Sequence, residues 1–463
     1  MNRLLRKTIF LTLIAGLGAP SFAQDLDKEI ERPGYATESQ ENAVETAGEA
    51  RKRETVEGSG EITYAQILED PDNIDLNYRY AKLQVERGDL RGAVATLERI
   101  LMVDPALPKV RLFYAVVLYR LDNLPEAERE LTALRKLPMP ASLLQEIDEY
   151  LKRIRRRTRR TNFDGSLGFG LQYDVNRNAA PATGRRLFGG VPVPLTTGLR
   201  QDDTSVLLMA AARVEHDLGT QAGHKLFGEL SYYRAEQTAV DTLDLQAYAF
   251  QLGAAFKRRW GDVTPSAVFD HIRLSEETYL RTRGAQLRYD KKYDNRTALF
   301  ARLRVAFHDY IKTTDVPTAT ERTGHRTDFS YGGSHILNPT MRLGLDLGFS
   351  HQDARKGYNR YDRHEVRGTH AWLLGKGRFL LTSMTLHVDR YSEPDTAIFN
   401  QRRADDTVRL GSTFGAPLGL IAPPLKDLLW TFTYEYFHSN SNIENYGYTN
   451  NKVSTMFTYR WEL

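Results

Sequence analysis

The sequence contains no cysteine among its 463 residues. This absence excludes a disulfide framework and metal sites built on thiolate ligands. Long apolar runs are scarce too, because beyond residue 23 no stretch reaches the length of about 20 apolar residues that a membrane-spanning helix needs, and the mean hydropathy is −0.48. We therefore predict no transmembrane helix.

The sequence also lacks the common catalytic motifs. It contains no Gly-x-Ser-x-Gly motif, no phosphate-binding loop and no His-Glu-x-x-His motif. His364, Glu365 and His370 lie close in sequence, but two histidines without a third ligand do not define a metal site. We predict that the protein is not an enzyme and that it binds no cofactor and no metal ion.

The first 23 residues have the layout of a cleavable secretory signal peptide. Basic side chains precede an apolar run over residues 9–17, which is too short to cross a membrane. Small residues flank Phe22 directly before Gln24, so we predict cleavage after Ala23. Residues 24–60 are rich in Glu, Lys, Gly, Ser and Thr and poor in large apolar residues, and we expect them to form a disordered periplasmic tail.

Residues 61–150 have a helical apolar pattern that repeats at an offset of 34 residues. Ala81 matches Ala115, and Leu97 matches Leu131 at the same spacing. These spacings resemble the tetratricopeptide repeat, in which small residues mark the crossing of the two helices of a repeat. We expect a short helical repeat domain over 61–150, with further helices near residues 64–68 and 141–154 covering its ends.

One face of this domain is a candidate client groove, because helical repeats use their concave surface for binding. The groove would be lined by the first helix of each repeat. The residues predicted to face it are Tyr78, Lys82, Val85, Leu112, Val116 and Tyr119. Ordinary packing between helices is the alternative role for the same side chains, and the sequence leaves both roles open.

From residue 162 to residue 463 the apolar pattern changes to a period of two, which is typical of β-strands with one buried face. Trp430, Phe432 and Tyr434 alternate with Thr431 and Thr433, for example. The ends of the apolar stripes carry Tyr, Trp and Phe, as the interface girdles of membrane barrels do. Strands of nine to eleven residues are also long enough for a tilted membrane crossing.

The alternating pattern predicts fourteen strands, with an uncertainty of two, and an even number suits a closed bacterial barrel. The predicted strands are 162–174, 203–216, 224–234, 244–257, 262–274, 279–290, 296–309, 324–337, 340–351, 363–374, 378–390, 403–415, 428–438 and 451–463. The predicted fold class is therefore α + β with several domains: a short α-helical, tetratricopeptide-like repeat domain followed by an antiparallel transmembrane β-barrel of about 14 strands.

The connections between the strands indicate how the barrel is oriented. Short connections at 218–224, 338–340 and 375–377 contrast with long polar ones at 175–202 and 391–402. Short turns face the periplasm in such barrels and long loops face outside. The final strand resembles the C-terminal segment that the barrel-assembly machinery recognises, although it ends on Leu463, and we expect that machinery as a partner during biogenesis.

The polar faces of the strands should line the lumen. The candidate lumen charges are Arg302, Arg304, Asp346, Glu435, Lys452 and Arg460. The ordinary role for such residues is a satisfied polar network that fills the interior. A barrel of about fourteen strands is intermediate between side-chain-filled barrels and water-filled porins, so the sequence leaves an open and a plugged lumen as alternatives.

Residues 151–161 contain a basic run between the last predicted helix and the first predicted strand. Basic side chains at a helix C-terminus complement its dipole, and near anionic lipid head groups each contributes on the order of 1 kcal/mol. The 63 basic residues of the chain are otherwise spread among 59 acidic ones. We therefore expect a basic linker that contacts outer-membrane lipids, and no nucleic-acid partner.

A signal peptide, a short repeat domain and a fourteen-strand barrel in one chain resemble the surface lipoprotein assembly modulator (Slam) family. The resemblance rests on the repeat spacing over 81–140, the strand start Phe163-Asp164-Gly165, the segment 170–176 and the closing Thr458-Tyr459-Arg460-Trp461. It implies an outer-membrane translocon that exports a protein client, either a surface lipoprotein or a secreted haem- or metal-acquisition-type protein. The repeat region is shorter than in the best-known members, and a polysaccharide export porin is the alternative function.

Overall fold

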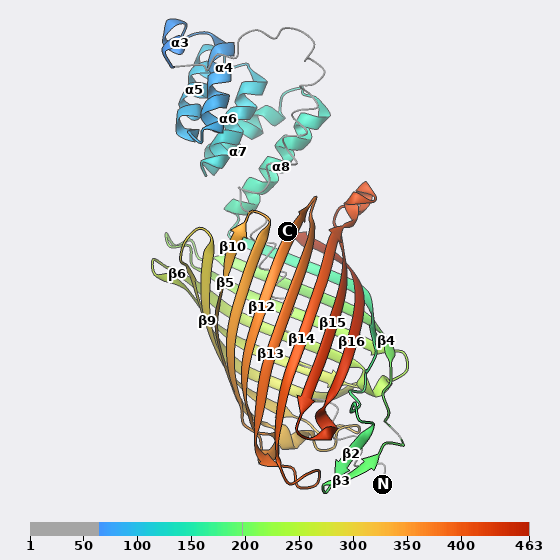
Figure 1. Ribbon diagram of the computed structural model, residues 1–463. Helices are drawn as coiled ribbons and strands as arrows, with labels where there is room; N and C mark the ends of the chain where they lie inside the picture. Colours follow the sequence, from blue (N-terminus) through green and yellow to red (C-terminus); the bar gives the residue numbers. More distant parts are fainter. Residues whose placement is uncertain (1–63, 197, 463) are drawn as a thin grey trace. The chain divides into compact units, whose positions relative to one another are not determined.

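The computed structural model describes residues 64–196 and 198–462. Within this part the chain forms two compact units, a helical unit and a barrel unit, which divide between Arg159 and Arg160 (Figure 1). The signal peptide predicted over residues 1–23 and the tail predicted over 24–60 lie outside the described residues. No helix in the described part is long and apolar enough to span a membrane.

The helical unit consists of consecutive short helices joined by tight turns. Asn73 and Asp89 cap two of these helices, since their side chains accept hydrogen bonds from the backbone N–H groups of Leu76 and Gly92. The turns inside the two helical pairs place Gly88 and Asp122 at positive φ, 34 residues apart. The helices are α3 (Tyr64–Glu69), α4 (Ile74–Glu86), α5 (Leu90–Val103), α6 (Pro108–Arg120), α7 (Leu124–Arg135) and α8 (Ala141–Thr158).

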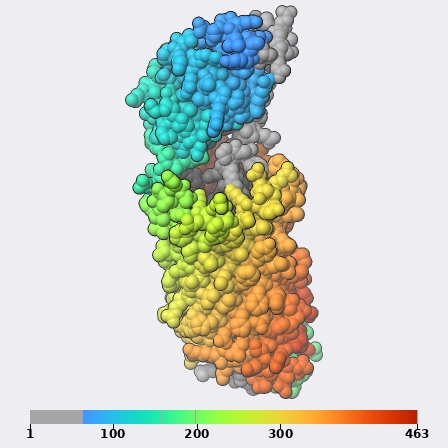
Figure 2. All heavy atoms as spheres, turned by 90° about the vertical axis from the view of Figure 1, so that its left-hand side faces the viewer, coloured from blue at the N-terminus to red at the C-terminus, as the bar shows by residue number. Residues whose placement is uncertain are grey.

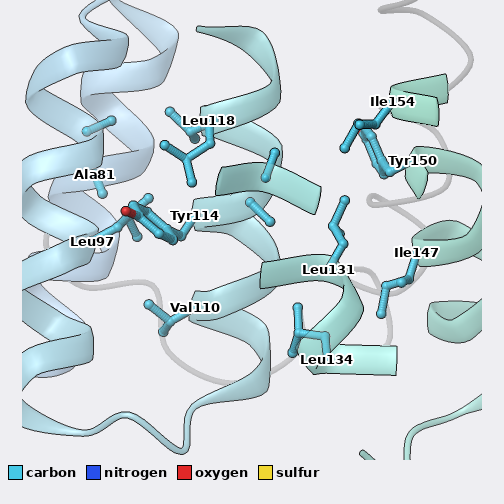
Figure 3. Packing of buried hydrophobic residues seen from close by; sticks show 14 of the residues in the cluster. Ala81, Leu97, Val110, Tyr114, Leu118, Leu131, Leu134, Ile147, Tyr150 and Ile154 are labelled. Atoms are coloured by element: carbon cyan, nitrogen blue, oxygen red, sulfur yellow. The ribbon is translucent and has the colours of Figure 1, made fainter. Parts of the chain in front are cut away.

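The core of this unit contains the residues that recur at the 34-residue spacing (Figure 3). Ala81, Ala115, Leu97 and Leu131 are all completely buried. The alanines allow close approach of the paired helices, and the leucines fill the space between one pair and the next. The repeat seen in the sequence is therefore a repeat of packing positions.

Helix α8 continues to Thr158, through most of the segment in which we expected a basic linker. The reason is that Leu151 and Ile154 are buried in the same core as Ile147 and Tyr150. The basic side chains of the segment occupy the other faces of an amphipathic helix.

Replacing Leu131 by alanine should destabilise the helical unit by about 2–5 kcal/mol, because the substitution opens a cavity in a close-packed core. Met102→Ala is the matched control, since Met102 is 81% exposed and its truncation should change stability by less than about 0.5 kcal/mol. Urea denaturation of the full chain in detergent, followed by the helical circular dichroism signal, measures both changes. Equal effects of the two substitutions would contradict the core role of Leu131.

The barrel unit is closed and contains fourteen antiparallel strands, which confirms the predicted fold class and strand count. Each strand pairs with the next one in the chain, and closure is made by β1 with β16. The strands are β1 (Thr161–Asp174), β4 (Asp203–Asp217), β5 (Lys225–Gln237), β6 (Leu245–Arg258), β7 (Gly261–Leu274), β8 (Glu277–Lys292), β9 (Thr297–Tyr310), β10 (Gly324–Asn338), β11 (Met341–Gln352), β12 (Tyr361–Gly375), β13 (Arg378–Pro394), β14 (Arg402–Pro417), β15 (Leu428–Ser441) and β16 (Tyr448–Glu462).

Alternate residues of every strand face outward, and most of the outward set is apolar. Phe163, Leu167 and Phe169 of β1 are each about half exposed on this outer surface, as is expected for an apolar face that contacts lipid. Figure 2 shows the outer wall as a continuous surface of side chains from the green strands through the yellow to the orange ones.

The two ends of the barrel differ in their connections. We call the end at which β1 begins the near end, and the opposite end the far end. Near-end connections are mostly short, such as 259–260, 339–340 and 376–377, whereas the far end carries the long loops 175–202 and 311–323. The longest far-end loop contains a hairpin that the sequence did not predict, formed by β2 (Arg185–Phe188) and β3 (Val191–Pro194).

Candidate functional site

The six predicted groove residues lie on α4 and α6, the first helices of the two pairs. Tyr78, Val85, Leu112, Val116 and Tyr119 are half-buried and pack against the helical core, while Lys82 is exposed. The five apolar and aromatic side chains therefore contribute to packing between helices and also present part of their surface to solvent.

Aromatic rings form a row along the first-helix face, half-buried on α4 and α6 and buried on α8. Tyr78 contacts Phe113 edge to face, with ring centroids 5.7 Å apart, and Tyr119 contacts Tyr150 of α8 at 5.4 Å. Sequence reasoning missed Phe113 and Tyr150 because it considered only two repeats and did not continue the face onto α8. The signal was available, since Tyr150 lies on a helix that packs as the first helix of a third unit.

Cationic side chains lie over these rings. Lys82 Nζ is 4.8 Å from the centroid of Tyr78, and the Arg157 guanidinium is 5.3 Å from the centroid of Tyr119. Burial raises the pKa of the Tyr78 and Tyr150 hydroxyls, and a tyrosine with its ordinary pKa of about 10 is already neutral at pH 7. Neutral rings flanked by cations suit an extended peptide that offers apolar and acidic side chains.

All six predicted lumen charges occupy inward-facing positions. Arg304 donates to Asp270 at 2.6 Å, and Arg302 donates to the Ser330 hydroxyl at 3.2 Å. Glu435 accepts from Arg409 at 3.3 Å and pairs with Lys452 at 3.5 Å. These charges are mostly held in ion pairs on the lumen wall.

The remaining two predicted lumen residues lie on the same inner wall. Asp346 of β11 reaches over its neighbour Gly332, where an added Cβ would lie 2.5 Å from the Asp346 carboxylate. Arg460 of β16 pairs in register with Ser166 of β1.

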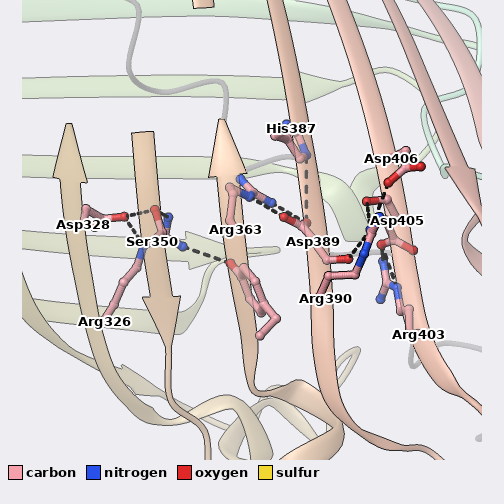
Figure 4. A network of polar contacts seen from close by, with 11 residues as sticks. Arg326, Asp328, Ser350, Arg363, His387, Asp389, Arg390, Arg403, Asp405 and Asp406 are labelled. Carbon is pink, nitrogen blue, oxygen red and sulfur yellow. Dashed lines mark hydrogen bonds and ion pairs between the residues drawn. The ribbon is translucent and has the colours of Figure 1, made fainter. Parts of the chain in front are cut away.

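A second polar network, nearer the far end, crosses the inner wall from β10 to β14 (Figure 4). Arg363 of β12 makes two hydrogen bonds, at 2.6 and 2.7 Å, to the carboxylate of Asp389 on β13. Arg403 donates to Asp405 at 2.7 Å and lies 4.6 Å from the ring centroid of Tyr391. The sequence analysis missed this network, although each member lies at an inward position of its strand.

The network continues onto β10 and β11. Arg326 donates to Asp328 at 2.8 Å, and Asp328 also accepts a hydrogen bond of 2.6 Å from the Ser350 hydroxyl. Arg326 donates to the Tyr361 hydroxyl as well, at 3.0 Å. Positive and negative groups therefore alternate around this part of the wall, which holds the strands in register.

Removing one partner of the buried Arg363–Asp389 pair should destabilise the barrel by about 3–5 kcal/mol, because a buried carboxylate loses its counter-charge. The matched control is Arg390→Ala, since the Arg390–Asp406 pair is about half exposed on the outer face at 2.9 Å, and exposed pairs contribute less than about 1 kcal/mol. Guanidinium unfolding of Arg363→Ala, read by the gel-mobility shift of the folded barrel, measures the difference. Equal midpoints for both variants would contradict it.

The first long loop covers the far end of the lumen. Asn176, Arg177 and Asn178 of this loop are at most 4% exposed. The Asn176 backbone N–H donates to the side chain of Asn450 on β16 at 2.9 Å, and Arg177 donates to the Leu243 carbonyl in the connection between β5 and β6 at 3.1 Å. The loop therefore contacts the barrel on both sides of β1, the strand from which it starts.

The lumen wall beside this loop is apolar on one side and charged on the other. Inward residues such as Leu207, Leu245 and Ile272 form a core with Val316 and Ala319 of the loop 311–323. On the charged side, Ala179 of the first loop lines a cavity of only about 30 Å³ against the network described above. The far end of the barrel is accordingly packed with loop residues.

Across residues 64–196 and 198–462, no group of three or more His, Asp or Glu side chains is arranged to hold a metal ion. His364 and Glu365 are neighbours on β12, so their side chains point to opposite faces of the wall, Glu365 inward with Gly348 and His364 outward with Phe349.

Comparison with known proteins gives two family matches. A model of the surface lipoprotein assembly modifier family matches residues 164–460, which is more than half of the chain. A tetratricopeptide repeat model matches residues 63–110 and 85–138. A search of curated proteins finds no significant match.

Among solved structures, the chain is similar to the following three proteins at low sequence identity. OccK8 (OprE) of Pseudomonas aeruginosa is 8% identical, with 65% of this chain and 98% of that chain covered and a TM-score of 0.33. The outer membrane channel DcaP of Acinetobacter baumannii is 8% identical, with 65% and 97% covered and a TM-score of 0.39. OmpT of Vibrio cholerae is 9% identical, with 65% and 97% covered and a TM-score of 0.37.

Proposed function

Because the chain belongs to the surface lipoprotein assembly modifier family, we propose that it is an outer-membrane translocon that exports a protein client from the periplasm to the cell surface or medium. The family places the protein in the outer membrane and in surface lipoprotein assembly. The client itself is proposed to be a surface lipoprotein or a secreted protein of the haem- or metal-acquisition type.

The observation that carries this proposal is the direct continuity of a helical repeat unit with a family-matching barrel. Helix α8 ends at Thr158 and β1 begins at Thr161. Function as a general nutrient porin would not explain the presence of such a unit. The half-buried rings of Tyr78, Phe113 and Tyr119 on α4 and α6 support a role in receiving an unfolded or partly folded chain.

In the proposed mechanism the near end faces the periplasm, where the repeat unit receives the client. The barrel then gives the client a route through its lumen or along its wall. The sequence has no phosphate-binding loop that would couple nucleotide hydrolysis to transport, so folding of the client outside supplies the direction. The first loop, which packs into the far end, has to move for a client to pass through the lumen.

Surface proteomics of a deletion strain against its parent tests the proposal. We expect one or a few specific proteins to disappear from the surface and medium and to accumulate in the periplasm. An unchanged protein profile together with a loss of surface polysaccharide would replace the proposal with the polysaccharide export porin.

The aromatic row allows a sharper test once the client is known. Tyr78→Ala should weaken binding of the unfolded client by about 2 kcal/mol, or roughly thirtyfold, as expected for loss of an aromatic anchor. Tyr64→Ala on α3 is the control, because Tyr64 is a surface-exposed tyrosine of the helical unit that lies on a different helix. Binding is measured on the full chain by titration of labelled client, and helical circular dichroism checks that both variants fold. If Tyr78→Ala bound the client with unchanged affinity, the aromatic row would not be the client-binding surface.

A further inference from the structure

A row of outward-facing residues crosses six strands of the barrel wall and contains two glycines. The pairing register aligns them as Leu299, Gly333, Leu345, Gly368, Met384 and Leu410, from β9 to β14. In the next outward row, farther from the near end, the wall carries large apolar side chains such as Tyr331, Leu347 and Val366. In the row described here, Gly333 and Gly368 lie on either side of Leu345 and have no side chain, so the wall is hollowed at these two positions.

The hollow is a groove of about 810 Å³, which is within the range of small-molecule binding sites. Thirteen of its nineteen lining residues occupy outward-facing positions, and three of the other six are glycines. The groove therefore opens on the lipid-facing side of the wall. It lies toward the near end of the strands, since Leu343 and Leu345 are close to the start of β11 at Met341.

The two glycines differ in what surrounds them. A Cβ added to Gly368 would meet no atom within 4 Å, whereas one added to Gly333 would lie 2.7 Å from a methyl group of Leu299. Gly368 therefore borders open space in the groove. A large side chain at this position can fill the groove without disturbing the sheet.

The rim of the groove on its near-end side is polar. One register row closer to the near end, His335 pairs with Thr297, and His370 pairs with Thr382. The Nδ1 atom of His335 is 3.0 Å from the Thr297 hydroxyl, and that of His370 is 3.5 Å from the Thr382 hydroxyl. An apolar groove that ends in imidazole and hydroxyl groups matches a molecule with a hydrocarbon chain and a polar ester or amide head.

We propose that this groove binds an acyl chain of a lipid-modified client during export, with the ester and amide groups of the lipidated terminus at the His335 and His370 rim. The inference rests on the proposed function for the identity of the lipid. In this proposal the two parts of a lipoprotein take separate routes. The acyl chain stays in hydrocarbon on the outer wall, while the polypeptide passes through the lumen or along the wall of the barrel. An acyl chain in this groove avoids the cost of crossing the polar lumen, which is lined with ion pairs.

The test uses the full chain in phosphatidylethanolamine vesicles and a synthetic triacylated lipopeptide with a photoactivatable group on one acyl chain. After irradiation, mass spectrometry locates the labelled residues. We expect labelling at Leu345 and Met384. Gly368→Trp should reduce this labelling about tenfold, the loss expected when two methylenes lose their contacts. Ala212→Trp is the control, because Ala212 is an exposed outward residue of β4, elsewhere on the wall.

Each other outcome overturns the proposal. Equal labelling of Leu345 by a photoactivatable phosphatidylethanolamine would mean that bulk lipid fills the groove. Labelling that Gly368→Trp leaves unchanged would place the lipopeptide elsewhere. Because binding is read without export, a failure of the groove is distinguishable from a failure of the proposed function, which the surface proteomics decides independently.

Discussion

Deletion of residues 61–158 is expected to reduce client export to background while the barrel still inserts in the outer membrane. The deletion ends at Thr158 because α8 packs into the helical core as far as Ile154, and a cut inside this helix would leave an exposed apolar stub. The barrel has its own closed sheet and its own loop core, so it should fold without the helical unit. The readout is the amount of client on the cell surface, measured with antibody on intact cells.

The heat-modifiable gel mobility of the barrel is the control for this deletion. A truncated protein that is inserted but inactive supports client reception by the repeat unit. Normal export by an inserted truncation would refute that role, and a matched full-length variant, Tyr64→Ala, should export normally in either case.

Replacement of residues 177–200 by a short Gly-Ser linker is expected to raise the conductance of the purified barrel severalfold. Within this range, Arg177 donates to the Leu243 carbonyl in the connection between β5 and β6, and Ala179 packs against the charged network on β12 to β14. The replacement takes this loop's residues out of the far end and leaves the pairing of the fourteen barrel strands unchanged. Single-channel recording in planar bilayers measures the change.

The control for this experiment is a shortening of the near-end turn 418–427, which lies at the opposite end of the strands from the loop. This variant should conduct as the unaltered protein does. If the loop deletion leaves the current as low as before, the lumen is closed by wall side chains such as the Arg363 and Arg403 pairs, and the loop has no gating role.

The sequence by itself determined the two kinds of structure and the face on which each residue lies. In the barrel this followed from the period of two, because neighbouring side chains of a strand point to opposite faces. The alternation therefore predicts one shared face, the polar one, for Arg302, Arg304, Glu435 and Lys452. In the helical unit the 34-residue spacing identified the positions where helices pack.

Only the tertiary structure decided which residues meet. Arg304 of β9 binds Asp270 of β7 across the intervening strand β8, and Gly333 lies in one row with Gly368. Both relations depend on the register of several strands in succession, which the alternation of a single strand does not contain. The inward fold of the first loop likewise depends on contacts such as that of Arg177 with Leu243. The alternation within one strand predicts the face on which a residue lies. The register of strand pairing around the closed sheet decides which residues it contacts.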